Sequence, residues 1–188
     1  MRQEKSPPAA VEEGIQVRLT MLKGDDIIIS ANQNFTEVVG MDVIKEFYDL
    51  AKAFCCFISE NQITIDCIPS LMEQLMKLYI SAMNLPNTSP EEDFDDTACC
   101  AEYLPIIISD EIPQFYWEVF DPFDQEDALC ADIADDLSDI AADLLSGIRE
   151  FEAGRINDAV FDWKFDLDTH WGNHLVDVLR ALHALRTH

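Results

Sequence analysis

Basic residues are scarce in this chain. Its 188 residues include 12 lysines and arginines against 37 aspartates and glutamates, so the formal net charge is −25. Nucleic-acid backbones and anionic membrane surfaces attract proteins through clustered lysine and arginine, so we expect the chain to bind neither directly. The charge is compatible with a basic protein partner, a divalent cation or a saline habitat, and equally with high solubility alone.

Glycine and the usual catalytic motifs are also scarce. The chain has only 6 glycines, and it contains neither a phosphate-binding glycine loop nor a Gly-x-Ser-x-Gly elbow. No histidine precedes His170, so the upstream sequence offers a cysteine no histidine partner. The sequence leaves an enzymatic role open but favours a protein that is not an enzyme.

The cysteines lack the spacing of a zinc knuckle or of a secreted disulfide framework. The six occur as Cys55-Cys56, Cys67, Cys99-Cys100 and Cys130, with no Cys-x-x-Cys pair. We expect reduced, buried thiols that act as small hydrophobic side chains. The N-terminus lacks the apolar region of a signal peptide, and no apolar run is long enough to cross a bilayer. The expected compartment is therefore the cytoplasm.

Residues 1–33 are predicted to form an N-terminal extension, and residues 34–188 a helical domain. The extension alternates apolar and polar residues up to Met21, has turn-forming residues at 23–26, and continues with Ile27-Ile28-Ile29. This pattern is compatible with a small β-hairpin or with a flexible, extended arm.

Beyond residue 34, apolar residues recur at helical spacing, which predicts an all-α bundle of roughly five helices. Asn34 with Glu37, and Ser70 with Glu73, have the spacing of a capping box, which marks the start of a helix. Shorter helical pieces are expected over residues 97–120, and the aromatic cluster at 115–117 is expected in the core. One long, central helix is expected over about 156–186.

The cleanest helical pattern spans about residues 130–153, with Gly154 placed to cap its end. On a helical wheel its acidic residues lie opposite its apolar face; the stripe consists of Asp132, Asp136, Asp139 and Asp143. Such a stripe can dock a basic partner or mimic nucleic acid. The alternative is an ordinary solvated helix face.

Two histidines are the sharpest candidates for chemistry. His170 and His174 are four residues apart, so on a helix both imidazoles project to one side and can share a metal ion, with Asp166 as a third ligand. The alternative is a core histidine that bonds a backbone carbonyl or an acid from another helix. The negative charge of the chain is expected to raise the pKa of His174.

Three segments carry a resemblance to a known family: residues 115–122, residues 138–140 and, most strongly, residues 170–185 with the run His170-Trp171-Gly172. Over roughly residues 38–187 the chain resembles a bacterial family catalogued only as a domain of unknown function. The resemblance implies an all-helical domain and supplies no activity, cofactor or catalytic residue.

These patterns favour a protein-interaction or regulatory module whose acidic face meets a protein partner. The alternative is a metal-binding protein or metal-dependent enzyme that uses His170 and His174. A further alternative is a nucleic-acid mimic. No cofactor other than a divalent metal ion is indicated.

Overall fold

The computed structural model describes residues 18–21, 27–30, 33–90, 103–119, 122–125 and 127–186, with side chains from residue 40 onward. Backbone contacts divide the chain into two units, Met1–Gly40 and Met41–His188. The expected boundary between residues 33 and 34 stays a prediction.

The N-terminal unit contains a two-stranded antiparallel sheet. Strand β1 (Arg18–Met21) pairs with β2 (Ile27–Ser30), and Met21 lies opposite Ile27. Of the two arrangements predicted for these residues, the hairpin is therefore the one observed. The turn predicted at 23–26 lies outside the described residues. Helix α1 (Gln33–Glu60) also begins in this unit, and the side chains of its proposed capping box lie outside the described part.

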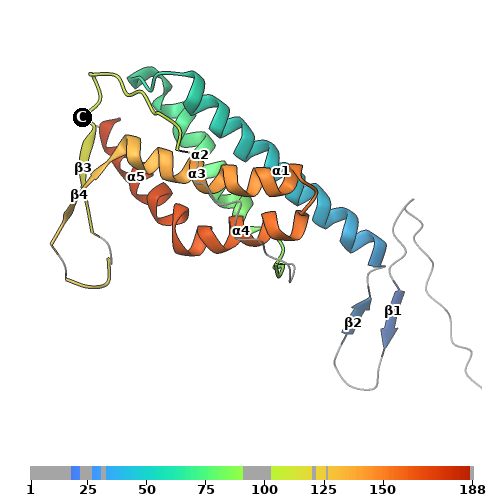
Figure 1. Cartoon of the computed structure of the whole chain (residues 1–188). Coiled ribbons are helices and arrows are strands. Elements are labelled where there is room, and N and C mark those ends of the chain that lie inside the picture. Colours follow the sequence, from blue (N-terminus) through green and yellow to red (C-terminus); the bar gives the residue numbers. More distant parts are fainter. Residues whose placement is uncertain are drawn as a thin grey trace, which may run out of the picture. The chain divides into compact units, whose positions relative to one another are not determined.

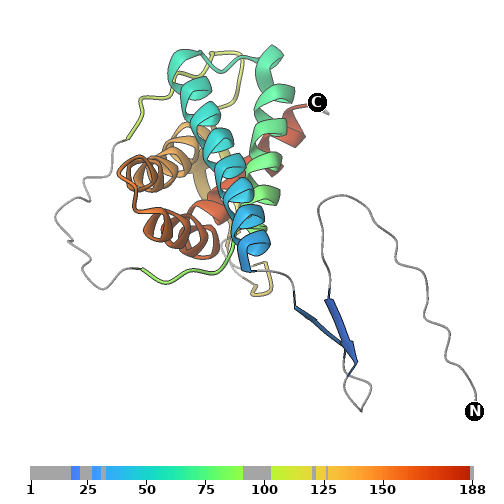
Figure 2. The ribbon, with the colours of Figure 1, turned by 90° about the vertical axis from the view of Figure 1, so that its right-hand side faces the viewer.

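The second unit is a helical bundle, which confirms the predicted all-α class (Figures 1 and 2). Besides most of α1 it holds α2 (Ile68–Met83), α3 (Ile133–Glu152), α4 (Ile156–Thr169) and α5 (Trp171–Leu185). A short 3-10 helix, η1 (Ile65–Cys67), precedes α2. Helix α2 begins two residues before Ser70, with Pro69 in its first turn, so the capping box predicted there is wrong. No helix of the described residues is long and apolar enough to cross a membrane.

The prediction of a single long helix over 156–186 is wrong, because the helix is interrupted at His170. This residue has φ −144° and ψ −86°, outside the helical region, and it separates α4 from α5. The turn brings the carbonyl oxygen of Leu167 to within 2.0 Å of where a Cβ on Gly172 would lie. Only glycine fits this close approach between the two helices.

Helix α3 packs against both α4 and α5. The predicted apolar face of α3 is buried, and so are residues on its flanks; the buried set includes Ile133, Leu137, Ile140, Ala141, Ala142, Leu144 and Ile148. The predicted end of this helix is confirmed by Gly154, whose φ of +86° lies in the left-handed region.

An aromatic cluster joins the helices. The ring of Phe47 on α1 meets Trp163 on α4 edge-on, with 4.9 Å between centroids, and lies 6.4 Å from the ring of Trp171 on α5. Both indole nitrogens donate to buried carbonyls: Trp163 to Leu144 at 3.1 Å, and Trp171 to Trp163 at 3.0 Å. These rings therefore fill the centre of the bundle with their polar atoms satisfied.

The helical pieces predicted over 97–120 are absent from residues 103–119, and residues 97–102 lie outside the described part. An extended segment lies there instead, and Ser109 donates its backbone N–H to the carbonyl of Ile63 at 2.8 Å. It leads into β3 (Phe115–Glu118), which pairs antiparallel with β4 (Leu129–Asp132). Strands alternate their side chains between two faces, so the aromatic cluster is split. Phe115 and Trp117 are 64% and 69% exposed, and their expected place in the core is wrong.

The four described cysteines are free thiols, but only Cys55 fits the expectation of full burial. Burial raises the pKa of its thiol to about 12, so it stays protonated. Cys56 and Cys130 are exposed, and Cys67 is half-buried.

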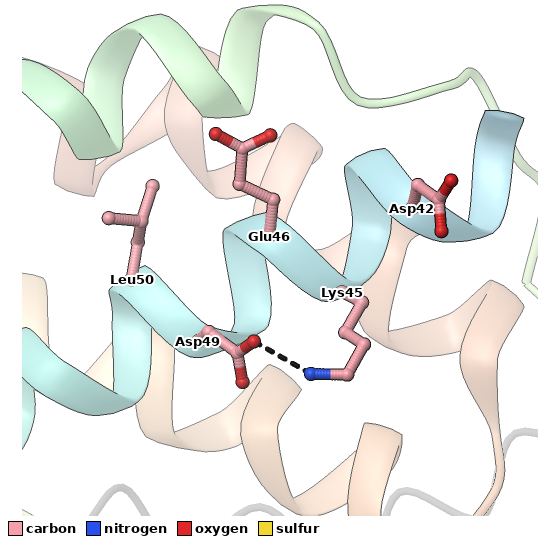
Figure 3. A pocket seen from close by; sticks show the side chains of 5 residues that line it. All are labelled: Asp42, Lys45, Glu46, Asp49 and Leu50. Atoms are coloured by element: carbon pink, nitrogen blue, oxygen red, sulfur yellow. Dashed lines mark hydrogen bonds and ion pairs between the residues drawn. The ribbon is translucent and has the colours of Figure 1, made fainter.

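The outer side of α1 carries a shallow hollow (Figure 3). Its lining comes from α1 alone and includes Lys45, whose ammonium pairs with Asp49 at 2.7 Å. This pair is one helical turn apart and largely exposed, so it contributes little to stability.

Candidate metal centre

His170 and His174 face helix α3, and each is held there by a different aspartate. His170, at the junction of α4 and α5, places its Nδ1 2.7 Å from Oδ2 of Asp143. His174, one turn into α5, places its Nδ1 2.9 Å from Oδ1 of Asp136. The two imidazole rings meet edge-on, with 4.9 Å between their centroids. The predicted pair is therefore brought together, with both rings oriented by carboxylates from one neighbouring helix.

The carboxylate of Asp136 is the most enclosed group of the site. The residue is 4% exposed, and each of its carboxylate oxygens has a partner. Oδ1 accepts from His174, and Oδ2 accepts from the hydroxyl of Tyr116 on β3 at 2.5 Å. The same hydroxyl lies 3.2 Å from Oε2 of Glu118. A buried carboxylate needs such donors because its charge is otherwise poorly solvated.

These contacts shift the pKa values of the groups involved. The hydrogen bond to Asp136 raises the pKa of His174, although burial opposes the shift; Asp139 and Glu118 add to it. Burial and the bond to Asp136 raise the pKa of the Tyr116 hydroxyl well above its usual range. Tyr116 therefore remains a donor at every physiological pH. The expected rise for His174 is confirmed, and its partner is an acid from another helix.

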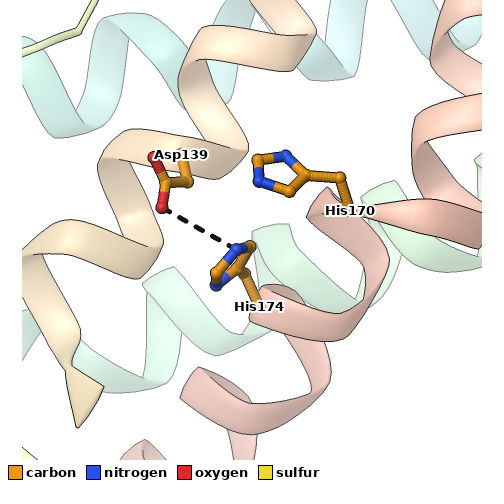
Figure 4. A group of neighbouring side chains, drawn as sticks. All are labelled: Asp139, His170 and His174. Carbon is orange, nitrogen blue, oxygen red and sulfur yellow. Dashed lines mark ion pairs between the residues drawn. The ribbon is translucent and has the colours of Figure 1, made fainter.

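Three side chains form a group that could hold a metal ion: Asp139, His170 and His174 (Figure 4). One ligand atom from each lies within 4.8 Å of the others, and Nε2 of His174 is already 3.7 Å from Oδ2 of Asp139. Around a bound ion, ligand atoms lie about 3–3.5 Å apart, given bonds of about 2.1 Å. Small rotations of the three side chains would therefore bring their ligand atoms to the separations found around a bound ion.

The carboxylate in this group is Asp139 of α3, and not the predicted Asp166. Asp166 lies four residues before His170, and its backbone carbonyl accepts the amide of His170 at 2.8 Å. Its half-buried carboxyl has a pKa raised to about 6 by burial and by Asp143, with His170 opposing the shift. The bend at His170 changes the direction of the chain between these two residues, which sequence spacing alone does not reveal.

The predicted acidic stripe of α3 does not face solvent as one surface. Asp132 caps the helix by accepting the amide of Ala134 at 2.8 Å, and Asp136 is buried against α5 and β3. Asp139 and Asp143 are half-buried beside the histidines. The expectation of a stripe on the outer face is therefore wrong for Asp136, because α5 and the β3–β4 hairpin cover that side of α3.

The two histidines also line a groove of about 580 Å³. Its other polar residues come from α2, α4, α5 and the end of β3, and include Glu118, Asn173, Asp177 and Arg180. Burial, followed by the charges of Glu118 and Asp136, raises the pKa of Asp177, whereas Arg180 lowers it. The histidines thus lie where a dissolved ion or small molecule can reach them.

The sequence indicates the two histidines, but it does not indicate Tyr116 or the place of Asp139 beside them. A helical wheel places Asp139 on the acidic face of α3, but it does not tell which neighbour that face meets. The sequence predicts that Tyr116 belongs to an aromatic cluster in the core, whereas its role depends on a strand that the sequence does not predict. Aromatic residues favour strands, so the run Phe115-Tyr116-Trp117 is a signal that could have indicated this one.

Comparison with solved structures shows similarity to the crystal structure of protein BF1032 from Bacteroides fragilis. The TM-score is 0.59 at 23% sequence identity, and the alignment covers 79% of this chain and 94% of the other. At this identity the likeness shows a shared fold and nothing more. No curated protein matches the chain.

The family described as a domain of unknown function, DUF5063, matches residues 39–188. This range holds α2 to α5, most of α1 and the whole β3–β4 hairpin, and therefore every residue of the candidate centre. The chain belongs to this family of helical domains of unknown function, as the resemblance of its C-terminal segments implied.

Proposed function

We propose that the protein binds one divalent transition-metal ion through Asp139, His170 and His174. The observation that carries the proposal is the pairing of both Nδ1 atoms with carboxylates, to Asp143 at 2.7 Å and to Asp136 at 2.9 Å. Metal-binding histidines almost always donate their second ring N–H to such a partner, which fixes the tautomer and makes the free nitrogen a better ligand.

The pairing leaves Nε2 of each imidazole for an ion. In His174 this atom already points toward the carboxylate of Asp139, 3.7 Å away. Three protein ligands, two nitrogen and one oxygen, leave positions open on a four- to six-coordinate ion. Water or a small molecule could reach those positions from the groove that the two histidines line.

The donor set favours some ions over others. Imidazole nitrogen suits zinc, iron, nickel and copper, whereas calcium and magnesium prefer a shell made of oxygens. The surrounding negative charge of Asp136, Asp139 and Asp143 would attract any of these cations. Selectivity would therefore come from the two nitrogens, and we expect zinc to bind much more tightly than calcium.

Titration calorimetry with Zn²⁺ and with Ca²⁺, on protein purified without a histidine tag, tests the proposal. We expect one Zn²⁺ per chain, and a loss of affinity of at least about 100-fold in His170→Ala, His174→Ala and Asp139→Asn. Asp143→Asn should weaken binding about 10-fold, because it removes only an orienting partner.

His183→Ala and Asp49→Asn are matched controls. His183 is an exposed residue on the same helix, and Asp49 is an exposed acid on α1. Both should leave Zn²⁺ affinity unchanged, because neither is near the centre. If Asp49→Asn weakens binding as much as the ligand variants do, the ion is held by the general negative charge. If His183→Ala does so, the ion is held at a different histidine. Either result would show that the proposal is wrong.

A second candidate function, protein interaction, is supported by the exposed aromatics of β3. Phe115 and Trp117 project from one face of the β3–β4 hairpin and are both more than 60% exposed. Large exposed aromatic residues that lie together often mark a site for a partner. The net charge of −25 indicates that this partner is basic, and an arginine side chain could stack on Trp117.

An arginine-rich peptide tests this second function, through the fluorescence of Trp117. Trp163 and Trp171 are buried, so replacing Trp117 with phenylalanine should remove the response while the fold is kept. Phe165→Ala, at an exposed position on α4, is the control. Titration calorimetry then measures the affinity of the variants without the reporter. Binding that is unaffected by Trp117→Phe and Phe115→Ala in that measurement would show that only the overall charge attracts the peptide.

A further inference from the structure

The β3–β4 hairpin has an inner and an outer face. Tyr116 and Glu118 alternate with Phe115 and Trp117 along β3, and the register pairs Tyr116 with Ala131. Tyr116 is half-buried and reaches Asp136, whereas Phe115 and Trp117 are exposed. One residue therefore links the hairpin to the candidate metal centre.

The link is a chain of two hydrogen bonds. The hydroxyl of Tyr116 carries one hydrogen and lies 2.5 Å from Asp136 but 3.2 Å from Glu118, so the bond to Asp136 is the stronger. The other oxygen of Asp136 accepts from Nδ1 of His174. Asp136 is buried, so loss of either donor leaves its carboxylate poorly solvated. The position of Tyr116 therefore affects how firmly the His174 ring is held.

We propose that Tyr116 is a positioning residue of the metal centre. Through it, metal binding and the packing of strand β3 against α3, with Tyr116 bonded to Asp136, stabilise each other. The inference rests on the proposed metal site. Tyr116 touches no ion; it holds Asp136, which orients the ligand His174.

The coupling must act in both directions. Suppose that the hydrogen bond from Tyr116 to Asp136 raises the metal affinity by some factor. A bound ion must then favour the state with this bond over the state without it by the same factor. Loss of an orienting partner weakens metal binding about 10- to 100-fold, and Tyr116 acts through one further residue. We therefore expect a factor of about 10 at most from this residue.

Other attachments of the hairpin do not pass through His174. Gln114 accepts the amide of Ile133 at 3.0 Å and donates its side-chain amide to Asp132 at 2.6 Å. These bonds fix the base of the hairpin to the start of α3 whether or not an ion is bound. The part of β3 that the ion should affect is therefore the segment around Tyr116.

Two measurements on the full chain test the inference, both with Zn²⁺ as the probe. The first is the Zn²⁺ affinity of Tyr116→Phe, which keeps the ring and removes the hydroxyl; we expect about 10-fold weaker binding. The second is amide hydrogen exchange of residues 115–118 with and without saturating Zn²⁺. Exchange should slow about 10-fold in the wild type and change little in Tyr116→Phe.

Tyr103→Phe is the matched control, because Tyr103 is an exposed tyrosine in the extended segment before β3. It should leave both the affinity and the exchange response as in the wild type.

The outcomes separate this inference from the proposed function. If the wild type binds no Zn²⁺, both are wrong. If it binds Zn²⁺ through the histidines but Tyr116→Phe binds equally well, only the role of Tyr116 is overturned. The same holds if the exchange of residues 115–118 does not respond to the ion.

Discussion

Asp162 lies on α4 between Asp158 and Asp166, one helical turn from each. Its side chain is half-buried, and burial, together with the charges of Asp166, Glu150 and Asp158, raises its pKa to about 6. A carboxyl group with a raised pKa binds its proton more tightly in the folded protein than in the unfolded chain. The ionised form therefore destabilises the fold.

We expect Asp162→Asn to stabilise the protein at pH 7 and to have a much smaller effect at pH 4. The unfolded carboxyl has a pKa near 3.8 and the folded one about 6, so the penalty grows as pH rises through this interval and is complete above it. After allowance for solvent screening, the gain at pH 7 should be on the order of 1 kcal/mol. Urea denaturation at both values of pH measures it.

Asp168→Asn, at an exposed position on the same helix, is the control and should change stability little at either pH. A stabilisation by Asp162→Asn that is equal at pH 4 and pH 7 would contradict the prediction, because it would not depend on the charge of the carboxylate.

At the level of residues, the sequence predicts that His170 and His174 lie close together, but it does not predict which carboxylates surround them. The four-residue spacing of His170 and His174 is a property of the chain and is readable directly. The identity of the third carboxylate depends on how α3 is rotated about its axis, and on the break at His170. Both result from packing against other helices, which the spacing of residues does not encode.

Gly147 lies at the contact between α3 and α4. A Cβ at this position would come within 2.2 Å of the indole nitrogen of Trp163, and the indole is fully buried. We expect Gly147→Ala to destabilise the protein by about 1–3 kcal/mol, because the ring cannot move without disturbing the packed core. Thermal or urea denaturation measures the loss.

Gly40→Ala is the matched control for this substitution. Gly40 also lies in a helix, but a Cβ there would meet nothing within 4 Å. Alanine is favoured over glycine in a helix by about 1 kcal/mol, so this variant should be slightly more stable than the wild type. Equal effects of the two substitutions would show that helix propensity, and not the contact with Trp163, decides the outcome.

At the level of elements, the sequence predicts a long amphipathic helix more securely than a short strand. The helix at 133–152 repeats its apolar pattern over five turns, so its existence and its end at Gly154 follow from the sequence. Strands β3 and β4 have four residues each, too few for a period to be distinguished. Their pairing joins residues 115 and 132, which are distant in sequence. The residue pattern within one strand does not reveal which other strand it pairs with.

The whole chain has 37 acidic and 12 basic side chains, which gives its net charge of −25, so lysine and arginine can pair with only a minority of the acids. Three of the described pairs, Lys45–Asp49, Lys52–Glu152 and Lys77–Glu73, are all about half-exposed or more. Exposed pairs contribute about 0–1 kcal/mol each. Repulsion among the acids should therefore outweigh these attractions and weaken the folded state at low salt.

We expect the melting temperature at pH 7 to rise by several degrees between 10 mM and 500 mM NaCl, because salt screens the repulsion. The effect should disappear near pH 4, close to the isoelectric point of about 4.1, where the net charge vanishes. Choline chloride should act like NaCl if screening is the cause. A fall in melting temperature with added salt would show that ion pairs dominate.

The family and the fold class could both be predicted from the sequence. The run from His170 to Leu185 carried the resemblance, and the match over residues 39–188 confirms it. The domain boundary at residue 33 and the role of the acidic charge stay predictions. Net charge is a property of composition, and the same value of −25 arises whether the acids bind a partner, hold an ion or only keep the chain in solution.

The alternation of side chains along β3 limits how this region can change in evolution. Insertion or deletion of one residue within β3 would exchange its two faces, turning Trp117 or Phe115 toward Asp136 and Tyr116 toward solvent. A phenylalanine there has no hydrogen to donate to the buried carboxylate. Changes of length should therefore be tolerated in the connection between β3 and β4, and relatives that keep the tyrosine should keep the length of the strand.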